Sequence, residues 1–410
     1  MNEAARRSAE PPGCAPLAAA LAARTSYGRL LALLASRSRD IAAAEDALAE
    51  ALATALAVWP ARGVPDNPDA WLLTAARRNI GRARARGATA ARESETMQML
   101  QDERDAAGPL PFGDDRLKLL FVCTHPAIAA DVQAPLMLQT VLGLDAARIA
   151  ASFLVSPAAM GQKLVRAKRR IRDAGIAFQV PDAAQLPARL AAVLQAIYAA
   201  FGNGWDDLKT RDGLTSEAIW LARLLCELQP EQPEAIGLLA LMLHCEARRP
   251  ARRDAAGAFV PLSAQDPQRW DAAMLHEAEA LLRFAACFGT PGRFQLEAAI
   301  QSLHAERVLT GADHGTALLA LHDLLLRIAP SAGAAVARAA VLAETDPAAA
   351  LDALAALTDR CADYQPWWAT RAHVLRRLGD GDGARVAARA AADRTGDAAV
   401  RHYLLATLQD

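Results

Sequence analysis

Residues 144–174 read LDAARIAASFLVSPAAMGQKLVRAKRRIRDA, and this stretch gives the clearest local indication of the fold. Asp145 can cap a short first helix over Ala146–Phe153, because its side-chain oxygen can accept a hydrogen bond from a free N–H at the helix start. A three-residue turn follows and ends at Ser156, which can cap a second helix. Pro157 occupies the first position of that helix, where a missing N–H costs nothing. The stretch therefore predicts two helices joined by a tight turn.

The second of these helices has one apolar face and one basic face. At about 100° per residue, four apolar residues share one narrow stripe: Met160, Leu164, Ala167 and Ile171. The other sides carry Gln162, Arg166, Arg169 and Arg172, with Lys163 and Arg170 on one border and Lys168 on the other. This pattern predicts a helix-turn-helix whose second helix reads base edges and binds phosphates. The alternative is an amphipathic helix whose charged face is only solvated.

A second basic element covers Asn67–Arg86. After Asp69 it contains no acidic residue, and its basic series is Arg77, Arg78, Arg82, Arg84 and Arg86. A basic helix with a tryptophan at its start, here Trp71, is suited to an opened DNA strand, through phosphate neutralisation and base stacking. The alternatives are core packing for Trp71 and a solvated face for the arginines.

The composition favours helices and excludes several classes of protein. Hydrophobic residues make up 53% of the chain, too much for a disordered protein, and aromatic residues make up 5%, too little to favour an all-β fold. The net charge of −1 hides an asymmetry: residues 1–180 carry 23 basic and 18 acidic side chains, and residues 181–410 carry 22 and 28. No apolar run reaches the length of a membrane span, and the six cysteines form no Cys-x-x-Cys pair. We therefore expect a protein of the reducing cytoplasm.

Almost every segment has the apolar spacing of an α-helix, so we expect an all-α protein. The chain divides into a helical block, a polar linker, a second helical block and a long third region: 18–90, 91–113, 114–176 and 181–410. In the third region Arg338-Ala-Ala-Val-Leu342 recurs 33 residues later as Arg371-Ala-His-Val-Leu375. This offset is typical of tetratricopeptide helix pairs, although two Ala- and Leu-rich hairpins could share it by chance.

Several stretches resemble the extracytoplasmic-function sigma factors. Three stretches resemble region 2 of that family: Ala44-Glu45-Asp46-Ala47-Leu48, Asn67-Pro68-Asp69-Ala70-Trp71-Leu72, and Ala76-Arg77. Region 4 of the family is similar to Leu142–Arg172. Three further stretches resemble one subgroup of the family: Asp115–Ala127, Phe153–Val155 and Lys163–Arg172. In that subgroup a long helical, tetratricopeptide-like C-terminal domain follows the sigma module. The resemblance implies an all-α chain with a region 2 bundle, a region 4 helix-turn-helix and a helical-repeat-like domain.

The resemblance also implies a dissociable initiation subunit of RNA polymerase, with no catalytic residue, metal or cofactor of its own. The helix that carries Glu45, Asp46 and Glu50 would face the clamp helices of the β′ subunit, and region 4 would contact the β flap. The residues implied at the −10 promoter element are Asn67, Trp71, Thr74, Arg77, Arg78, Asn79, Arg82 and Arg84. Those implied at the −35 element are Ser156, Ala159, Gln162, Lys163, Arg166, Arg169 and Arg170.

Three positions depart from the pattern of that family. Ala49 stands where a glutamine is usual, and Gly81 and Arg82 stand where the family usually has isoleucine and aspartate. Because glycine disfavours a helix interior by about 1 kcal/mol and Arg82 reverses a charge, a second interpretation stays open. In it, the chain is a helical-repeat scaffold for other proteins, with a vestigial sigma module that no longer binds promoters.

Neither the third region nor the cysteines contain a residue pattern that indicates an enzyme. No nucleophile–base pair, phosphate-binding loop or zinc spacing is present, and Cys123 with His125 lacks a second pair of ligands. We expect Cys123, His125, His244 and Cys245 to lie at packing or helix-surface positions, and Trp367 and Trp368 to pack between repeats. The excess of acidic side chains in 181–410 suggests that this region regulates the basic module or binds a regulatory protein.

Overall fold

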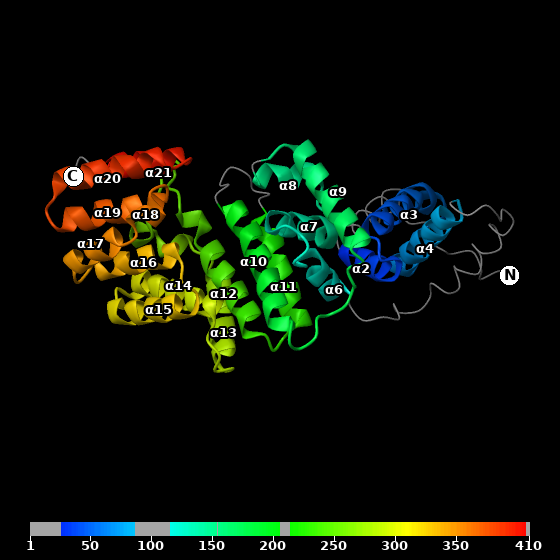
Figure 1. Cartoon of the computed structure of the whole chain (residues 1–410), viewed down its shortest axis with the longest axis horizontal. Helices are drawn as coiled ribbons and strands as arrows, with labels where there is room; N and C mark the ends of the chain where they lie inside the picture. The colour runs from blue at the N-terminus through cyan, green and yellow to red at the C-terminus, as the bar shows by residue number, and fades with distance from the viewer. Residues whose placement is uncertain (1–25, 87–114, 154, 206–213, 407–410) are drawn as a thin grey trace, which may run out of the picture. The chain divides into compact units, whose positions relative to one another are not determined.

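The computed structural model describes residues 26–86, 115–153, 155–205 and 214–406, and these form α-helices with short connections (Figure 1). The part of the chain so described has no β-strand; it has one isolated antiparallel bridge between Arg253 and Phe259. The prediction of an all-α protein is confirmed. None of the described helices combines the length and the apolar character that crossing a bilayer requires.

The chain forms two compact units, Met1–Leu221 and Ala222–Asp410, and the boundary falls within α11 (Thr215–Leu228). The first unit contains α2 (Tyr27–Ser38), α3 (Ile41–Arg62), α4 (Pro68–Arg86), α6 (Arg116–Cys123), α7 (Ala130–Leu142), α8 (Ala146–Ser152), α9 (Pro157–Asp173) and α10 (Leu186–Trp205). The two helical blocks expected at 18–90 and 114–176 therefore belong to one compact unit.

Helix α2 is the centre of the first unit. It packs against α3 and α4, which follow it directly in the chain, and also against α6 and α7 of the second predicted block. Its buried residues include Leu30, Leu31 and Leu34. The contact with α7 is very close, because a methyl group at Gly28 would lie 2.0 Å from the carbonyl oxygen of Val141. Ser36 Oγ also donates to Asp115 Oδ2 at 2.7 Å, beside the start of α6. Helix α2 therefore packs against helices of both predicted blocks.

The first unit extends further along the chain than the sequence predicts. Helix α10 packs on α6 and α7, and the Arg189 guanidinium donates to the carbonyl oxygen of Phe121. Arg148 of α8 forms an ion pair with Glu217 of α11. The compact unit thus includes residues up to Leu221. Sequence periodicity identifies α10 as a helix but does not say which neighbours cover its apolar face.

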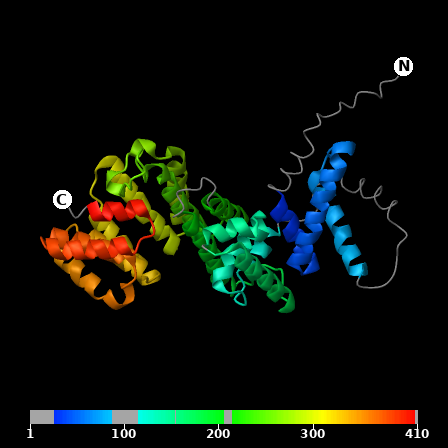
Figure 2. The ribbon, with the colours of Figure 1, turned by 90° about the horizontal axis from the view of Figure 1, so that it is seen from above.

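The second unit is a succession of helical hairpins. Its helices are α12 (Pro233–Ala247), α13 (Ala272–Ala286), α14 (Arg293–Thr310), α15 (Gly315–Ile328), α16 (Ala332–Leu342), α17 (Pro347–Ala355), α18 (Thr358–Cys361), α19 (Gln365–Arg377), α20 (Gly381–Asp393) and α21 (Ala398–Ala406), with 3-10 turns at Arg249–Ala251, Leu262–Ala264 and Pro267–Arg269. The two predicted repeat copies lie in α16 and α19. Each of these helices packs on the next helix, α17 and α20 respectively, and the two also pack on each other. The hairpins near the C-terminus lie side by side in Figure 2.

Trp367 organises this end of the second unit. Its side chain is buried, and its Nε1 donates to the carbonyl oxygen of Leu354 at 2.9 Å. The adjacent ring of Trp368 meets it edge-on at 4.7 Å between centroids. Both rings therefore pack between neighbouring hairpins, as the sequence predicts.

Candidate nucleic-acid interface

Helix α9 has the local structure that its sequence predicts. Ser156 caps it by accepting a hydrogen bond from the N–H of Ala159 at 3.2 Å, and Pro157 is its first residue. Asp145 caps α8 in the same way, accepting from the N–H of Arg148 at 2.8 Å. The four apolar residues of the stripe are buried: Met160, Leu164, Ala167 and Ile171. One face of α9 therefore docks on the protein and fixes which residues face solvent.

The solvent face of α9 carries most of the residues predicted for the −35 element. Ser156, Gln162, Arg166, Arg169 and Arg170 are exposed. Ala159 and Lys163 are half-buried, and Lys163 Nζ lies 2.7 Å from Asp131 Oδ2 of α7. An exposed basic surface of this kind can neutralise phosphates, while the polar residues near the start of the helix can reach base edges.

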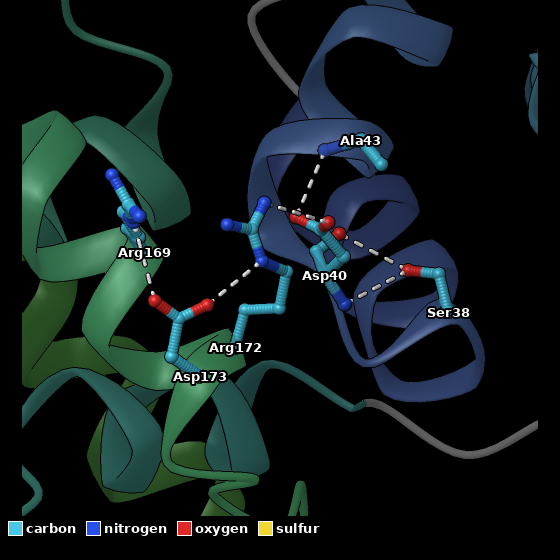
Figure 3. Close-up of polar contacts among 6 residues, drawn as sticks. All are labelled: Ser38, Asp40, Ala43, Arg169, Arg172 and Asp173. Carbon is cyan, nitrogen blue, oxygen red and sulfur yellow. Dashed lines mark hydrogen bonds and ion pairs between the residues drawn. The ribbon is translucent and has the colours of Figure 1, made fainter.

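The opposite edge of α9 faces α3, and here the charges are paired. Lys168 is 8% exposed and forms an ion pair with Glu45 of α3. One turn further on, Arg172 Nη1 lies 3.6 Å from Asp40 Oδ2. Figure 3 shows Arg172 between Asp40 and Asp173, and Asp173 also accepts from Arg169 Nε at 3.2 Å. The sequence places Lys168 on the border of a solvated face, but the structure buries it.

The three acidic residues predicted to meet polymerase lie in two different environments. Asp46 and Glu50 are exposed on α3, whereas the Glu45 side chain is 17% exposed and faces Lys168. Burial raises the pKa of the Glu45 carboxyl above its ordinary value, and the neighbouring Lys168 ammonium offsets this only in part. Its Oε1 is buried without a hydrogen-bond partner among the described residues. Glu45 is therefore held at an energetic cost.

A pocket of about 640 Å³ lies beside this contact, between α3, α4 and the end of α9. Its lining includes Asp46 and Glu50 from α3, Asn79 from α4, and Arg172 from α9. Asp40 also lines it and caps α3 by accepting from the N–H of Ala43 at 3.1 Å, as drawn in Figure 3. The residues predicted for polymerase and the basic end of α9 thus border the same hollow.

Helix α4 exposes fewer of its predicted DNA-binding residues than α9 does. Arg82 is exposed, and Trp71, Thr74, Arg77 and Arg78 are half-buried. Asn67 Oδ1 accepts from the N–H of Ala70 at 3.1 Å, as a helix-capping residue does. The side chain of Arg84 lies outside the described side chains.

Two further residues of α4 serve packing. Asn79 is 8% exposed, and its Nδ2 donates to the carbonyl oxygen of Ala47 in α3 at 3.2 Å. This position removes Asn79 from the surface that could meet DNA. Trp71 contacts the buried ring of Trp59 edge-on at 5.5 Å between centroids, so its ring takes part in the packing of α4 on α3. Burial and the neighbouring Arg37 lower the pKa of Arg77.

The cysteine and histidine residues considered as metal ligands have other partners. Cys123 is buried with its Sγ 3.3 Å from Thr140 Oγ1, and burial raises the pKa of its thiol to about 12. His125 Nδ1 accepts from the N–H of Ala127 at 3.1 Å. Within the described ranges, no group of three or more His, Cys, Asp or Glu side chains is placed to hold a metal ion. His244 is buried in α12, and Cys245 beside it is half-buried.

Sequence reasoning did not identify the contact between α3 and α9. Lys168 is separated from Glu45 by 123 positions, and no local pattern links them. One signal was present in the sequence: Lys168 lies next to Ala167 and three residues before Ile171, at the margin of the apolar stripe. A long, flexible side chain at such a margin can fold back along a neighbouring helix.

Comparison with known proteins gives two similarities. Residues 189–286, from the first turn of α10 to the end of α13, match the model of a family of unknown function, DUF6596. The uncharacterized protein R00370 of Rhizobium meliloti (strain 1021) is 38% identical over 360 residues, which cover 85% of each chain. No solved structure matches the chain. With this identity over most of both chains, the protein belongs to the same family as R00370 of Rhizobium meliloti.

Proposed function

We propose that the protein is an initiation factor of the extracytoplasmic-function sigma type, which binds core RNA polymerase and directs it to a class of promoters. The α8–α9 pair carries this proposal. It combines a capped seven-residue helix, a tight turn and a capped second helix whose exposed face holds Gln162, Arg166, Arg169 and Arg170. Such a protein acts where polymerase acts, in the cytoplasm, and contributes no catalytic residue or cofactor.

The acidic residues of α3 support the same function. Asp46 and Glu50 are exposed, and they lie on the helix that resembles the polymerase-binding part of region 2. The exposed Arg82 and the half-buried Trp71, Thr74 and Arg77 of α4 supply the surface proposed for the −10 element. In this proposal α3 faces the β′ clamp helices and the unit that contains α9 also contacts the β flap.

The direct test is reconstitution with core RNA polymerase. The purified full chain is mixed with core polymerase, the complex is followed by size-exclusion chromatography, and run-off transcription is measured on a library of genomic fragments. We expect co-elution and a defined set of start sites. An Asp46→Lys and Glu50→Lys double variant should lose co-elution, while Arg283→Ala, an exposed arginine of the second unit, serves as the control. A chain that neither co-elutes nor supports any start site would refute the proposal.

We propose further that the second unit regulates the first or binds a regulatory protein. The support is the charge asymmetry between residues 1–180 and 181–410 together with the stacked hairpins of that unit, an architecture that offers long binding surfaces. A truncation should end after α11, at Leu228, because α10 packs within the first unit. We expect the truncated chain to differ from the full chain in promoter activity or target choice. Identical profiles would exclude a regulatory role.

The alternative function is a protein-interaction scaffold with a vestigial sigma module. Its specific support is α4, where Asn79 is buried, Asn67 caps the helix, and Gly81 and Arg82 depart from the family pattern. A pull-down from the native host distinguishes the two functions. The scaffold interpretation predicts recovery of other proteins without polymerase subunits, whereas the sigma interpretation predicts recovery of β and β′.

A further inference from the structure

Val165 is an apolar side chain that lies exposed in the middle of the basic surface of α9. Its exposed fraction is 65%, whereas Met160, Leu164 and Ile171 of the same helix are at most 2% exposed. Burial of a valine stabilises a fold, so a valine left in solvent adds little to the packing of α9. One exposed valine is ordinary on a protein surface, and its significance depends on what surrounds it.

Five exposed residues share one face of α9, which we call the reading face: Ala158, Gln162, Val165, Arg166 and Arg169. At about 100° per residue, they fall within about 100° of the helix circumference, opposite the buried stripe. Val165 lies three residues after Gln162 and four before Arg169, and residues at these spacings are neighbours on a helix surface. The reading face therefore presents an amide, an apolar group and a guanidinium in one row.

The surface beside Val165 is open toward the start of α9. The residue one turn earlier is Gly161, and a methyl group added there would have no atom within 4 Å. Helical side chains lean toward the N-terminus, so Val165 stands over this uncovered turn. A glycine also allows a partner to approach the helix backbone closely. A flat group such as a base edge can therefore reach Val165 without displacing another side chain.

The charges around Val165 favour DNA as the partner. Arg166 and Arg170 form no ion pair within the described part of the chain, and Arg169 Nε lies 3.2 Å from Asp173 Oδ2. The major groove of DNA offers phosphates to such cations. Its floor also offers one apolar group, the C5-methyl group of thymine. Because valine has no hydrogen-bond donor or acceptor in its side chain, it can distinguish bases there only through that methyl group.

The spacing along α9 matches neighbouring base pairs. At a rise of about 1.5 Å per residue, Val165 lies about 4.5 Å beyond Gln162 along the helix axis, and base pairs stack about 3.4 Å apart. A glutamine in the major groove binds adenine through two hydrogen bonds. Gln162 and Val165 can therefore contact base pairs that lie one or two steps apart, with Arg169 about 6 Å further on.

We propose that Val165 is a specificity-determining residue of α9: it selects a thymine through the methyl group of that base, one or two base pairs from the base that Gln162 contacts. The proposal rests on the proposed function and deepens it, because it names a part of the DNA sequence that a promoter of this protein must contain. The arginines contribute affinity for any sequence through phosphates, whereas Val165 contributes only where the thymine methyl group is present.

The removal of one methyl group from the DNA tests the proposal. Duplexes are selected by the full chain, alone and together with core polymerase, from a pool with a randomised segment. Each thymine of the selected site is then replaced in turn by deoxyuridine, which lacks only the methyl group. Burial of one such group contributes about 0.8 kcal/mol, or about fourfold in affinity. We expect one thymine whose replacement weakens binding by the wild-type chain about fourfold, measured by fluorescence anisotropy.

Two valine variants assign this preference to a residue. Val165→Ala should bind the thymine duplex at least fourfold more weakly than wild type and should no longer distinguish thymine from uracil at that position. Val386→Ala is the matched control, because Val386 on α20 is 66% exposed and so nearly equal to Val165 in exposure. The control should keep both the affinity and the preference. Since both side chains are exposed, circular dichroism should show unchanged helicity in both variants.

The possible results separate this proposal from the proposed function. If Val165→Ala still prefers thymine as strongly as wild type, or if no thymine of the selected site is sensitive, the proposal is wrong while DNA binding by the chain stands. If Val165→Ala binds core polymerase more weakly without DNA, Val165 belongs to a protein contact and the proposal is also wrong. If no duplex is selected under either condition, the proposed function fails and base selection by Val165 fails with it.

Discussion

Helices α4 and α9 are both basic and both predicted to meet DNA, yet they present their side chains to solvent very differently. The apolar stripe of α9 is confined to about 60° of the helix circumference, so Arg166, Arg169 and Arg170 stay exposed. The buried residues of α4, Ala70, Leu72, Leu73, Ala76 and Asn79, are spread over roughly half of the circumference. A wide buried face draws neighbouring polar residues into packing, and a basic sequence alone does not reveal its width.

The largest expected effect sharpens this comparison on α9. Arg166→Ala with Arg169→Ala should weaken promoter-fragment binding by about 2–6 kcal/mol and reduce the slope of log affinity against log salt by about two. Because both side chains are exposed, the free energy of unfolding should stay within about 0.5 kcal/mol of wild type. Fluorescence anisotropy across a salt series measures the first effect and urea unfolding the second. Binding that is unchanged would remove α9 as the reading helix.

The next effect concerns Trp71 on α4. Trp71→Ala removes the edge-on contact with Trp59 and should lower the free energy of unfolding of the first unit by about 2 kcal/mol. Trp71→Phe keeps an aromatic ring and should recover most of that loss. Urea unfolding of both variants measures the difference. If Trp71→Ala left stability unchanged and abolished binding to a bubble-containing promoter, Trp71 would serve DNA alone.

A smaller effect is expected at Asn79. Asn79→Ala removes the hydrogen bond to Ala47 and should destabilise the first unit by about 1 kcal/mol. Its affinity for promoter DNA, measured at a temperature where the variant stays folded, should equal that of wild type. A selective loss of DNA affinity with normal stability would place Asn79 at the DNA surface. Helix α4 would then, like α9, present its predicted residues to DNA.

The smallest effect is a pH dependence centred on Glu45. Since burial raises the pKa of the Glu45 carboxyl, the folded unit binds a proton at this group more tightly than the unfolded chain does. This contribution stabilises the folded unit below the ordinary pKa of a glutamate and is lost as pH rises through the raised value. The Glu45 carboxyl interacts electrostatically with five titratable neighbours: Lys168, Asp40, Asp46, Tyr27 and Cys123. Glu45→Gln should flatten the pH dependence of amide exchange in α9 between neutral pH and the ordinary glutamate pKa, and an unchanged profile would assign that dependence to another group.

Much of the fold could be predicted because its signals are local. The caps at Asp145 and Ser156, Pro157 and the stripe beginning at Met160 define α8 and α9 before any tertiary contact forms. The 33-residue recurrence likewise identified α16 and α19 as related elements. The end of the first unit was harder to predict from the sequence, because α10 has the same helical periodicity whether it packs on α7 or on a following repeat.

Local signals in the sequence were enough to predict an all-α chain, the start of α9 and the face of α9 that carries the exposed arginines, because helix caps and 3.6-residue periodicity act over a few residues. Only the tertiary structure decided that Lys168 is buried against Glu45, that Asn79 bonds to α3, and that α2 packs against helices of both predicted blocks, with Gly28 close to Val141. These contacts join residues 32 to 123 positions apart. Their partners are set by how helices pack in space, and no local pattern of residues encodes that choice.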